Sequence, residues 1–183
     1  MKKESTGKYV FRLAFTLFAI TAVVAMCLAA VNGVTEQRIA DTKAEKARQA
    51  VEAVLPGGGE ELKTFEDETG LVSRVYVSDA GYAMEVNPSG FGGPITMMVG
   101  VSREGEVLGV SIVTQTETAG LGAVAAAKTS AGAAFRHQFR GMTGVLAVKK
   151  DGGSVDAITG ATITSRAVTE GVNAAVACAA GLQ

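Results

Sequence analysis

The residues best suited to chemistry lie near the C-terminus, where positions 156–165 read Asp-Ala-Ile-Thr-Gly-Ala-Thr-Ile-Thr-Ser. Three threonines and a serine supply hydroxyl groups there, and small residues stand between them. A hydroxyl that accepts a phosphoryl group needs open approach, which Gly160 and Ala161 leave. Gly160 can also adopt a positive φ and turn the following residues outward. The competing interpretation is an ordinary strand-to-helix turn, because Gly and Thr are common in turns.

The residues that follow, 166–180, have the periodicity of a helix. Its expected apolar face recurs at close to 3.6-residue spacing and comprises Ala167, Val168, Val172, Ala175, Val176 and Ala179. We expect Thr164 or Ser165 as the N-cap and Gly181 as the end of this helix. The N-terminus of such a helix offers unpaired N–H groups and the positive end of its dipole, and both favour a bound phosphate.

Composition disfavours several other chemistries. The 183 residues suit one domain with an appendage, and the net charge of −1 gives no basic footprint for nucleic acid. Cys27 and Cys178 are far apart in apolar surroundings, so we expect no disulfide framework and no metal or iron–sulfur site from this chain alone. His137 is the only histidine, so neither a bis-histidine haem nor a multi-histidine metal centre can form; we expect His137 on a helix surface.

An apolar segment near the N-terminus predicts a membrane anchor. Residues 13–31 are nineteen positions without a charge, which as a helix span about 28 Å. A secretory signal peptide has a shorter apolar region of about 7–15 residues, and a lipoprotein would use Cys27, which the large Met26 precedes. We therefore expect a retained single span. Basic residues are equally numerous on both sides, but Lys8 and Arg12 lie closest to the span, which favours a cytoplasmic N-terminus and an extracytoplasmic domain.

The rest of the chain predicts a single α+β domain after a helical connection. The expected parts are a tail at 1–10, a transmembrane helix at 11–34, a juxtamembrane helix and linker at 35–58, and an extracytoplasmic domain at 60–183. Strands are expected at 71–77, 82–86, 95–101 and 107–114, with shorter ones at 145–149 and 155–158. Helical pieces are expected within 120–139, interrupted around 130–132. This order predicts an antiparallel sheet with flanking helices.

The glycine-rich segment at 120–125 matches a relaxed dinucleotide-binding fingerprint. That fold needs an acidic residue about twenty positions later and a repeated βαβ unit. No acid occurs between Glu117 and Asp151, so we do not favour a Rossmann site.

Three motifs carry a resemblance to a known family. They are Gly90-Phe91-Gly92-Gly93-Pro94-Ile95, Gln115-Thr116-Glu117-Thr118-Ala119-Gly120-Leu121-Gly122, and Asp156 followed by Thr159-Gly160-Ala161-Thr162. With the N-terminal anchor they come in the order found in the G subunit of Rnf electron-transport complexes, so the resemblance covers nearly the whole chain. The related C subunit of the sodium-pumping NADH:quinone reductase is the alternative. Gln115 stands where the family motif has His, and Ala119 stands where it has Pro.

The resemblance implies a flavin site. In this family a separate flavin transferase cleaves FAD and leaves FMN joined covalently to a threonine, which here is Thr162. The resemblance implies that the phosphate pocket also includes Thr159, Gly160, Ala161, Thr164 and Ser165. It implies that the ribityl chain or ring is approached by Glu117, Thr118, Gly120 and Leu121. Asp156 either helps the transferase to recognise its target or anchors the turn.

The implied function is that of a membrane-anchored flavoprotein subunit that relays electrons within a multi-subunit complex. By resemblance, that complex couples electron transfer between ferredoxin and NAD to the transport of Na+ or H+. The expected partners are the other subunits, the flavin transferase and membrane lipid. The span contains no charged residue, so we do not expect it to conduct the ion. A stand-alone extracellular FMN carrier and a non-redox membrane adaptor remain as alternatives.

Overall fold

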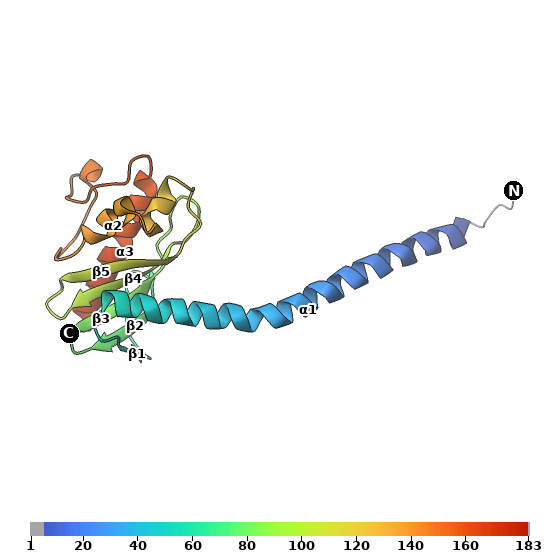
Figure 1. The fold of residues 1–183 in the computed structure, drawn as a ribbon, viewed down its shortest axis with the longest axis horizontal. Coiled ribbons are helices and arrows are strands. Elements are labelled where there is room, and N and C mark those ends of the chain that lie inside the picture. Colours follow the sequence, from blue (N-terminus) through green and yellow to red (C-terminus); the bar gives the residue numbers. More distant parts are fainter. Residues whose placement is uncertain (1–5, 183) are drawn as a thin grey trace. The chain divides into compact units, whose positions relative to one another are not determined.

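The computed structural model describes residues 6–182 and divides the chain into two units, Met1–Glu45 and Lys46–Gln183. The elements are α1 (Thr6–Val54), β1 (Glu60–Leu62), β2 (Val72–Ser78), β3 (Gly81–Val86), β4 (Thr96–Ser102), β5 (Val107–Thr114), the 3₁₀ helix η1 (Gly122–Ala126), α2 (Ser130–His137), the 3₁₀ helix η2 (Lys149–Asp151) and α3 (Thr162–Gly181) (Figure 1). The expected α+β fold with an N-terminal apolar helix and an antiparallel sheet is confirmed.

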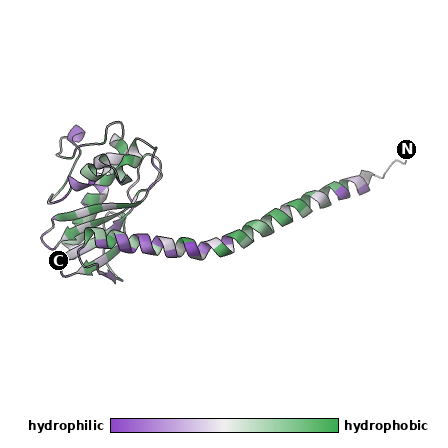
Figure 2. Cartoon of the chain, viewed as in Figure 1, coloured by the Kyte–Doolittle hydropathy of each residue, from purple (hydrophilic) through white to green (hydrophobic). Residues whose placement is uncertain are grey.

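The first unit is the N-terminal part of α1. Figure 2 shows hydrophobic residues predominating along this part of the helix, followed by a hydrophilic stretch. Among residues 6–182, α1 is the one helix long and apolar enough to cross a membrane. Within it the hydroxyls of Thr16 and Thr35 donate to the carbonyl oxygens four residues earlier, at 2.8 and 2.7 Å. Because these donors are satisfied inside the helix, they do not oppose an apolar environment.

The second unit contains an antiparallel meander in the order β1-β2-β3-β4-β5, in which each strand pairs with the next along the chain. The four main strands lie within one residue of their predicted positions, and β1 is an addition of three residues. The strands predicted at 145–149 and 155–158 do not form. Those segments share only an isolated parallel bridge between Val148 and Val155 and otherwise flank η2. A parallel ladder needs a crossover of a dozen or more residues, and the loop between these segments is too short for one.

Helices cover both faces of the sheet. Met84 and Val99 belong to the core beneath α3, whereas their neighbours Ala83 and Met98 belong to a second cluster with the last turn of α1. This alternation follows from the two-residue period of a strand. A Cβ on Gly100 would overlap the carbonyl oxygen of Val54, so the glycine lets α1 lie directly on β4.

The last turns of α1 are therefore part of the folded domain. Ala50, Val51, Val54 and Leu55 are all buried in the second cluster. The sequence predicts a separate juxtamembrane helix and linker at 35–58. The structure instead runs one helix through to Val54 and assigns the chain from Lys46 onward to the domain.

The helical region after β5 is also interrupted at a different place from the one expected. The break falls at 127–129, and Ser130 begins α2. The cause is Thr129, whose side chain accepts a hydrogen bond from the Gly132 N–H and so caps α2. His137 ends α2 and is exposed, as the sequence predicts.

Candidate functional site: the turn before α3

A tight turn at 158–161 leads into α3. Gly160 has a φ of +76°, as the sequence predicts, and the Ala161 N–H donates to the Ile158 carbonyl at 2.9 Å. The buried Ser165 hydroxyl accepts from the Ile158 N–H at 3.0 Å and donates to the Ala161 carbonyl at 2.9 Å. Ser165, which lies in the helix, therefore stabilises the turn through these two hydrogen bonds.

The predicted N-caps of α3 are wrong. The N-cap is Ala161, the helix begins at Thr162, and Thr164 and Ser165 lie in its first turn. The Ser165 N–H already donates to the Ala161 carbonyl at 3.0 Å, so the helical ladder starts earlier than expected. Neither hydroxyl is left to bind a phosphate as a free donor, since each donates to a protein oxygen.

The N-terminus of α3 is nevertheless open to a ligand. No side chain caps it, so the N–H groups of residues 162–164 lack an intrahelical acceptor. Thr162 is half-buried at this end, and Ile163 beside it is 50% exposed. The helix is 20 residues long, so its dipole adds positive potential at this position.

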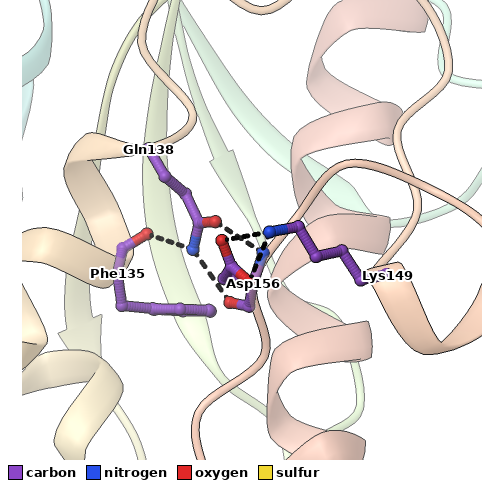
Figure 3. Close-up of polar contacts among 4 residues, drawn as sticks. All are labelled: Phe135, Gln138, Lys149 and Asp156. Atoms are coloured by element: carbon purple, nitrogen blue, oxygen red, sulfur yellow. Dashed lines mark hydrogen bonds and ion pairs between the residues drawn. The ribbon is translucent and has the colours of Figure 1, made fainter.

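Asp156 is held mainly through its backbone. Figure 3 shows the Gln138 amide facing it: the Asp156 N–H donates to Gln138 Oε1 at 2.7 Å, and Gln138 Nε2 donates to the Asp156 carbonyl at 3.0 Å. Gln138 Nε2 also donates to the Phe135 carbonyl at 3.0 Å. The Asp156 carboxylate pairs with Lys149 Nζ at 2.8 Å, but these side chains are 72% and 61% exposed. The turn is thus anchored by Gln138, while the carboxylate stays at the surface.

A second surface ion pair joins η2 to α3. The Arg166 guanidinium donates two hydrogen bonds of 2.6 Å to the Asp151 carboxylate. This bidentate contact lowers the pKa of Asp151 below its ordinary value and raises the pKa of Arg166. The Asp151–Arg166 pair therefore joins η2 to the first turns of α3, while Gln138 holds the backbone of Asp156.

Glu117 connects two of the motifs to α3. Its carboxylate is buried; Oε1 accepts from the Gly92 N–H at 2.8 Å, and Oε2 accepts from the Thr164 hydroxyl. The preceding Thr116 hydroxyl donates to the Gly92 carbonyl at 2.9 Å. The Glu117 carboxylate thus joins the loop at 90–93 to the first turn of α3, and its expected approach to the ribityl chain or ring stays a prediction.

The other residues of that motif lie at the surface. Thr118, Gly120 and Leu121 are exposed. The Thr118 carbonyl accepts from the Leu121 N–H at 3.1 Å, which closes a turn before η1. A Cβ on Gly160 would lie 3.0 Å from Leu121 Cδ2, so this side chain lies beside the turn that precedes Thr162.

A cleft of about 510 Å³ adjoins the turn. Its lining is mostly small or apolar and consists of Gly120, Val124, Ala131, Ala134, Phe135, Gln138, Asp156, Ala157, Ile158 and Thr159. The volume is within the range of small-molecule sites, which is about 300–1,000 Å³. Among the predicted site residues, Asp156, Thr159 and Gly120 line this cleft.

Sequence reasoning missed the parts of the site that have no motif of their own. Gln138 fixes the backbone of Asp156, and Lys149 pairs with its carboxylate, yet both stand in ordinary sequence. The loop at 90–93 was recognised as a motif but was not assigned a contact; the signal that could have suggested one is its three glycines beside Phe91.

The residues present fit FMN. A phosphate matches the unpaired N–H groups at residues 162–164, and the adjoining cleft offers apolar walls of suitable size for a planar ring. Within the part of the chain that the structure describes, no group of three His, Cys, Asp or Glu side chains could hold a metal ion.

Comparison with known proteins agrees with this geometry. Residues 90–177 match the family described as the FMN-binding domain. The chain is 32% identical to the G subunit of the Na+-translocating ferredoxin:NAD+ oxidoreductase complex of Acetobacterium woodii, over 96% of this chain and 94% of that protein. It is 33% identical to the G subunit of the ion-translocating oxidoreductase complex of Pseudomonas aeruginosa, over 87% of this chain and 83% of that protein.

A third relative differs in the ion that its name specifies. The G subunit of the proton-translocating ferredoxin:NAD+ oxidoreductase complex of Clostridium ljungdahlii is 29% identical, over 96% of this chain and 95% of that protein. At this coverage the alignment extends well beyond the matched domain. The chain therefore belongs to the family of G subunits of ion-translocating oxidoreductase complexes, and it contains an FMN-binding domain.

Proposed function

We propose that this chain is the membrane-anchored flavoprotein subunit of an ion-translocating electron-transport complex, with FMN joined covalently to Thr162. The observation that carries the proposal is the convergence of three motifs on the first turn of α3. The loop at 90–93, Glu117 and the first turn of α3 are far apart in sequence, yet hydrogen bonds from Gly92 and Thr164 to the Glu117 carboxylate join them.

Thr162 is the best-placed acceptor among the hydroxyls of the turn. The Thr164 and Ser165 hydroxyls are buried and donate to protein oxygens, and Thr159 lies in the wall of the cleft. Thr162 instead stands at the open end of α3, behind the small residues Gly160 and Ala161. Its position places the phosphate of an attached group beside the unpaired N–H groups at 162–164.

The attachment step is a phosphoryl transfer in which FAD is the co-substrate and a flavin transferase is the catalyst. The Thr162 oxygen forms a bond to the phosphorus of the FMN half of FAD, and the diphosphate P–O bond breaks. AMP leaves with the bridging oxygen, and the hydroxyl proton is released. The dipole of α3 favours the remaining negative charge on the phosphodiester.

Bound FMN would supply the redox chemistry, and the protein would supply its placement. The cleft residues would exclude water from one side of a bound ring. A covalent link through the phosphate would also prevent loss of the cofactor by dilution on the outer side of a membrane.

The apolar part of α1 and the family support the proposals for the anchor and the partners. We propose that α1 crosses the membrane with its apolar side chains against lipid, and that the domain lies on the extracytoplasmic side with the other subunits of the complex. By analogy with the relatives, electron transfer between ferredoxin and NAD would drive the transport of Na+ or H+. Residues 13–31 carry no charge, so the ion would pass through other subunits.

The test is to co-express the full chain with an active flavin transferase and to measure the FMN adduct. We expect in-gel flavin fluorescence after denaturing electrophoresis, and mass spectrometry of the tryptic peptide that begins at Asp151 should place the adduct on Thr162. Thr162→Ala should abolish the adduct. Thr159→Ala should retain at least part of it, because one neutral hydrogen bond is worth only about 0.5–1.5 kcal/mol.

Two outcomes would refute the proposal. An adduct on Thr159 or Thr164 would show that the acceptor is misassigned. A chain that carries no flavin beside an active transferase would instead support a non-redox membrane adaptor.

A further inference from the structure

Glu117 is a buried carboxylate that no part of the proposed attachment chemistry yet uses. It is 9% exposed, and both of its bonded partners, the Gly92 N–H and the Thr164 hydroxyl, are uncharged. A buried carboxylate is costly unless it is well hydrogen-bonded and favourably placed. The nearby N-terminus of α3 supplies partial positive charge, which offsets part of that cost.

The backbone at Gly90 and at Gly122 lies so close to the Glu117 carboxylate that neither position has space for a side chain. A Cβ on Gly90 would overlap Glu117 Oε1, and a Cβ on Gly122 would overlap Glu117 Oε2 and Thr164 Oγ1. Two separate segments therefore approach the same side chain without side chains of their own. One glycine in each of the first two motifs, Gly90 and Gly122, thus has the same physical reason, which is the close approach of the backbone to the Glu117 carboxylate.

The contact with Thr164 reaches the acceptor. Thr164 is the third residue of α3, and Thr162 is the first. With its hydroxyl bonded to Glu117, Thr164 fixes the rotation of the first turn about the helix axis. Because backbone positions within one turn are coupled through their dihedral angles, this also fixes the direction of the Cα–Cβ bond of Thr162, from which its hydroxyl extends.

We propose that Glu117 is the positioning residue of the flavin-attachment site, holding the first turn of α3 through Thr164 so that the Thr162 hydroxyl is accessible to the transferase. This inference rests on the proposed attachment at Thr162. It assigns Glu117 a role in maturation of the protein.

Thr164→Val is the principal test, because valine keeps the branched shape of threonine and replaces only the hydroxyl by a methyl group. The matched control is Thr169→Val on the same helix: Thr169 is also buried, and its hydroxyl donates to the Ser165 carbonyl at 2.8 Å, away from Glu117. Both variants lose one buried hydroxyl from α3, but only Thr164→Val removes a hydrogen bond to Glu117, so the control shows what loss of a helix hydroxyl does by itself.

The assay uses the detergent-purified full chain, purified transferase and FAD, and it follows the initial rate of FMN addition by intact mass. We expect Thr164→Val and Glu117→Gln each to slow the addition by about tenfold or more, and Thr169→Val to keep the parental rate. Thr164→Ser, which retains a hydroxyl, should recover rate relative to Thr164→Val. Combining Glu117→Gln with Thr164→Val should slow the reaction no further than the slower single variant.

Parental rates for Thr164→Val would overturn the inference, and so would equal slowing by Thr169→Val. If Glu117→Gln does not fold, the threonine variants decide the question. Absence of the adduct from the parent chain would refute the proposed function, which distinguishes that failure from failure of the role assigned to Glu117.

Discussion

Leu55 tests whether the end of α1 belongs to the domain. Its side chain is fully buried against a cluster that includes Ala83 and Met98 of the sheet. Leu→Ala at a buried site removes the transfer energy of the lost atoms and leaves a cavity, at a cost of about 2–5 kcal/mol. We expect Leu55→Ala to fall in the upper half of that range, because the site lies between a helix end and a sheet and has little freedom to collapse.

The assay is urea unfolding of a fragment that spans Lys46–Gln183, followed by far-ultraviolet circular dichroism. The control is Val145→Ala, which removes methyl groups from a side chain that is 94% exposed and should change the free energy of unfolding by less than about 0.5 kcal/mol. A Leu55→Ala fragment as stable as the Val145→Ala fragment would refute the domain boundary at Lys46. A fragment that begins at Gly57 should be less stable than the Lys46–Gln183 fragment for the same reason.

Two further predictions concern the surface pairs beside the turn. Asp151 has a pKa below its unfolded value of about 3.9, so its pair with Arg166 stabilises the fold above that pH and is lost as the pH falls through the lower, folded pKa. Asp151→Asn should therefore lose less stability than the parent when urea unfolding at about pH 7 is compared with about pH 2; an equal loss would contradict this. Asp156→Asn should unfold within about 0.5 kcal/mol of the parent, since its carboxylate makes only an exposed pair. We expect slower flavin addition to that stable variant, consistent with recognition by the transferase; a larger loss of stability would instead make the carboxylate an anchor of the turn.

The sheet could be predicted from sequence because its signals are local. Each of the four main strands shows β-rich residues between turn residues, and the turn at 103–106 indicates the β4–β5 hairpin. The short segments at 145–149 and 155–158 are also rich in β-forming residues, but within residues 6–182 they have no adjacent strand of the sheet to pair with. Whether such a segment forms a strand depends on a pairing strand being close in space, which its composition does not show.

The site could be predicted in part for the same reason. The turn, the positive φ of Gly160 and the helix after it follow from residue types in one short stretch. The first residue of α3 was predicted wrongly. Ser165 was expected to be an N-cap outside the helix, but it lies within the first turn and its hydroxyl is hydrogen-bonded to Ile158 and Ala161 of the preceding turn. Glu117 and Gln138 act on residues 47 and 18 positions away, and such long-range contacts leave no periodic trace in a single sequence.

The meander has a consequence for when the cofactor can be attached. Strands β1 to β5 pair only with their sequence neighbours, so the sheet can form from local contacts while the chain is still being made. We expect the turn before Thr162 to form later, because it needs α3 packed on that sheet and the contact of Thr164 with Glu117, 47 residues earlier. A transferase that requires this arrangement would modify folded chains and pass over unfolded ones, so the flavin would mark those molecules that have completed folding.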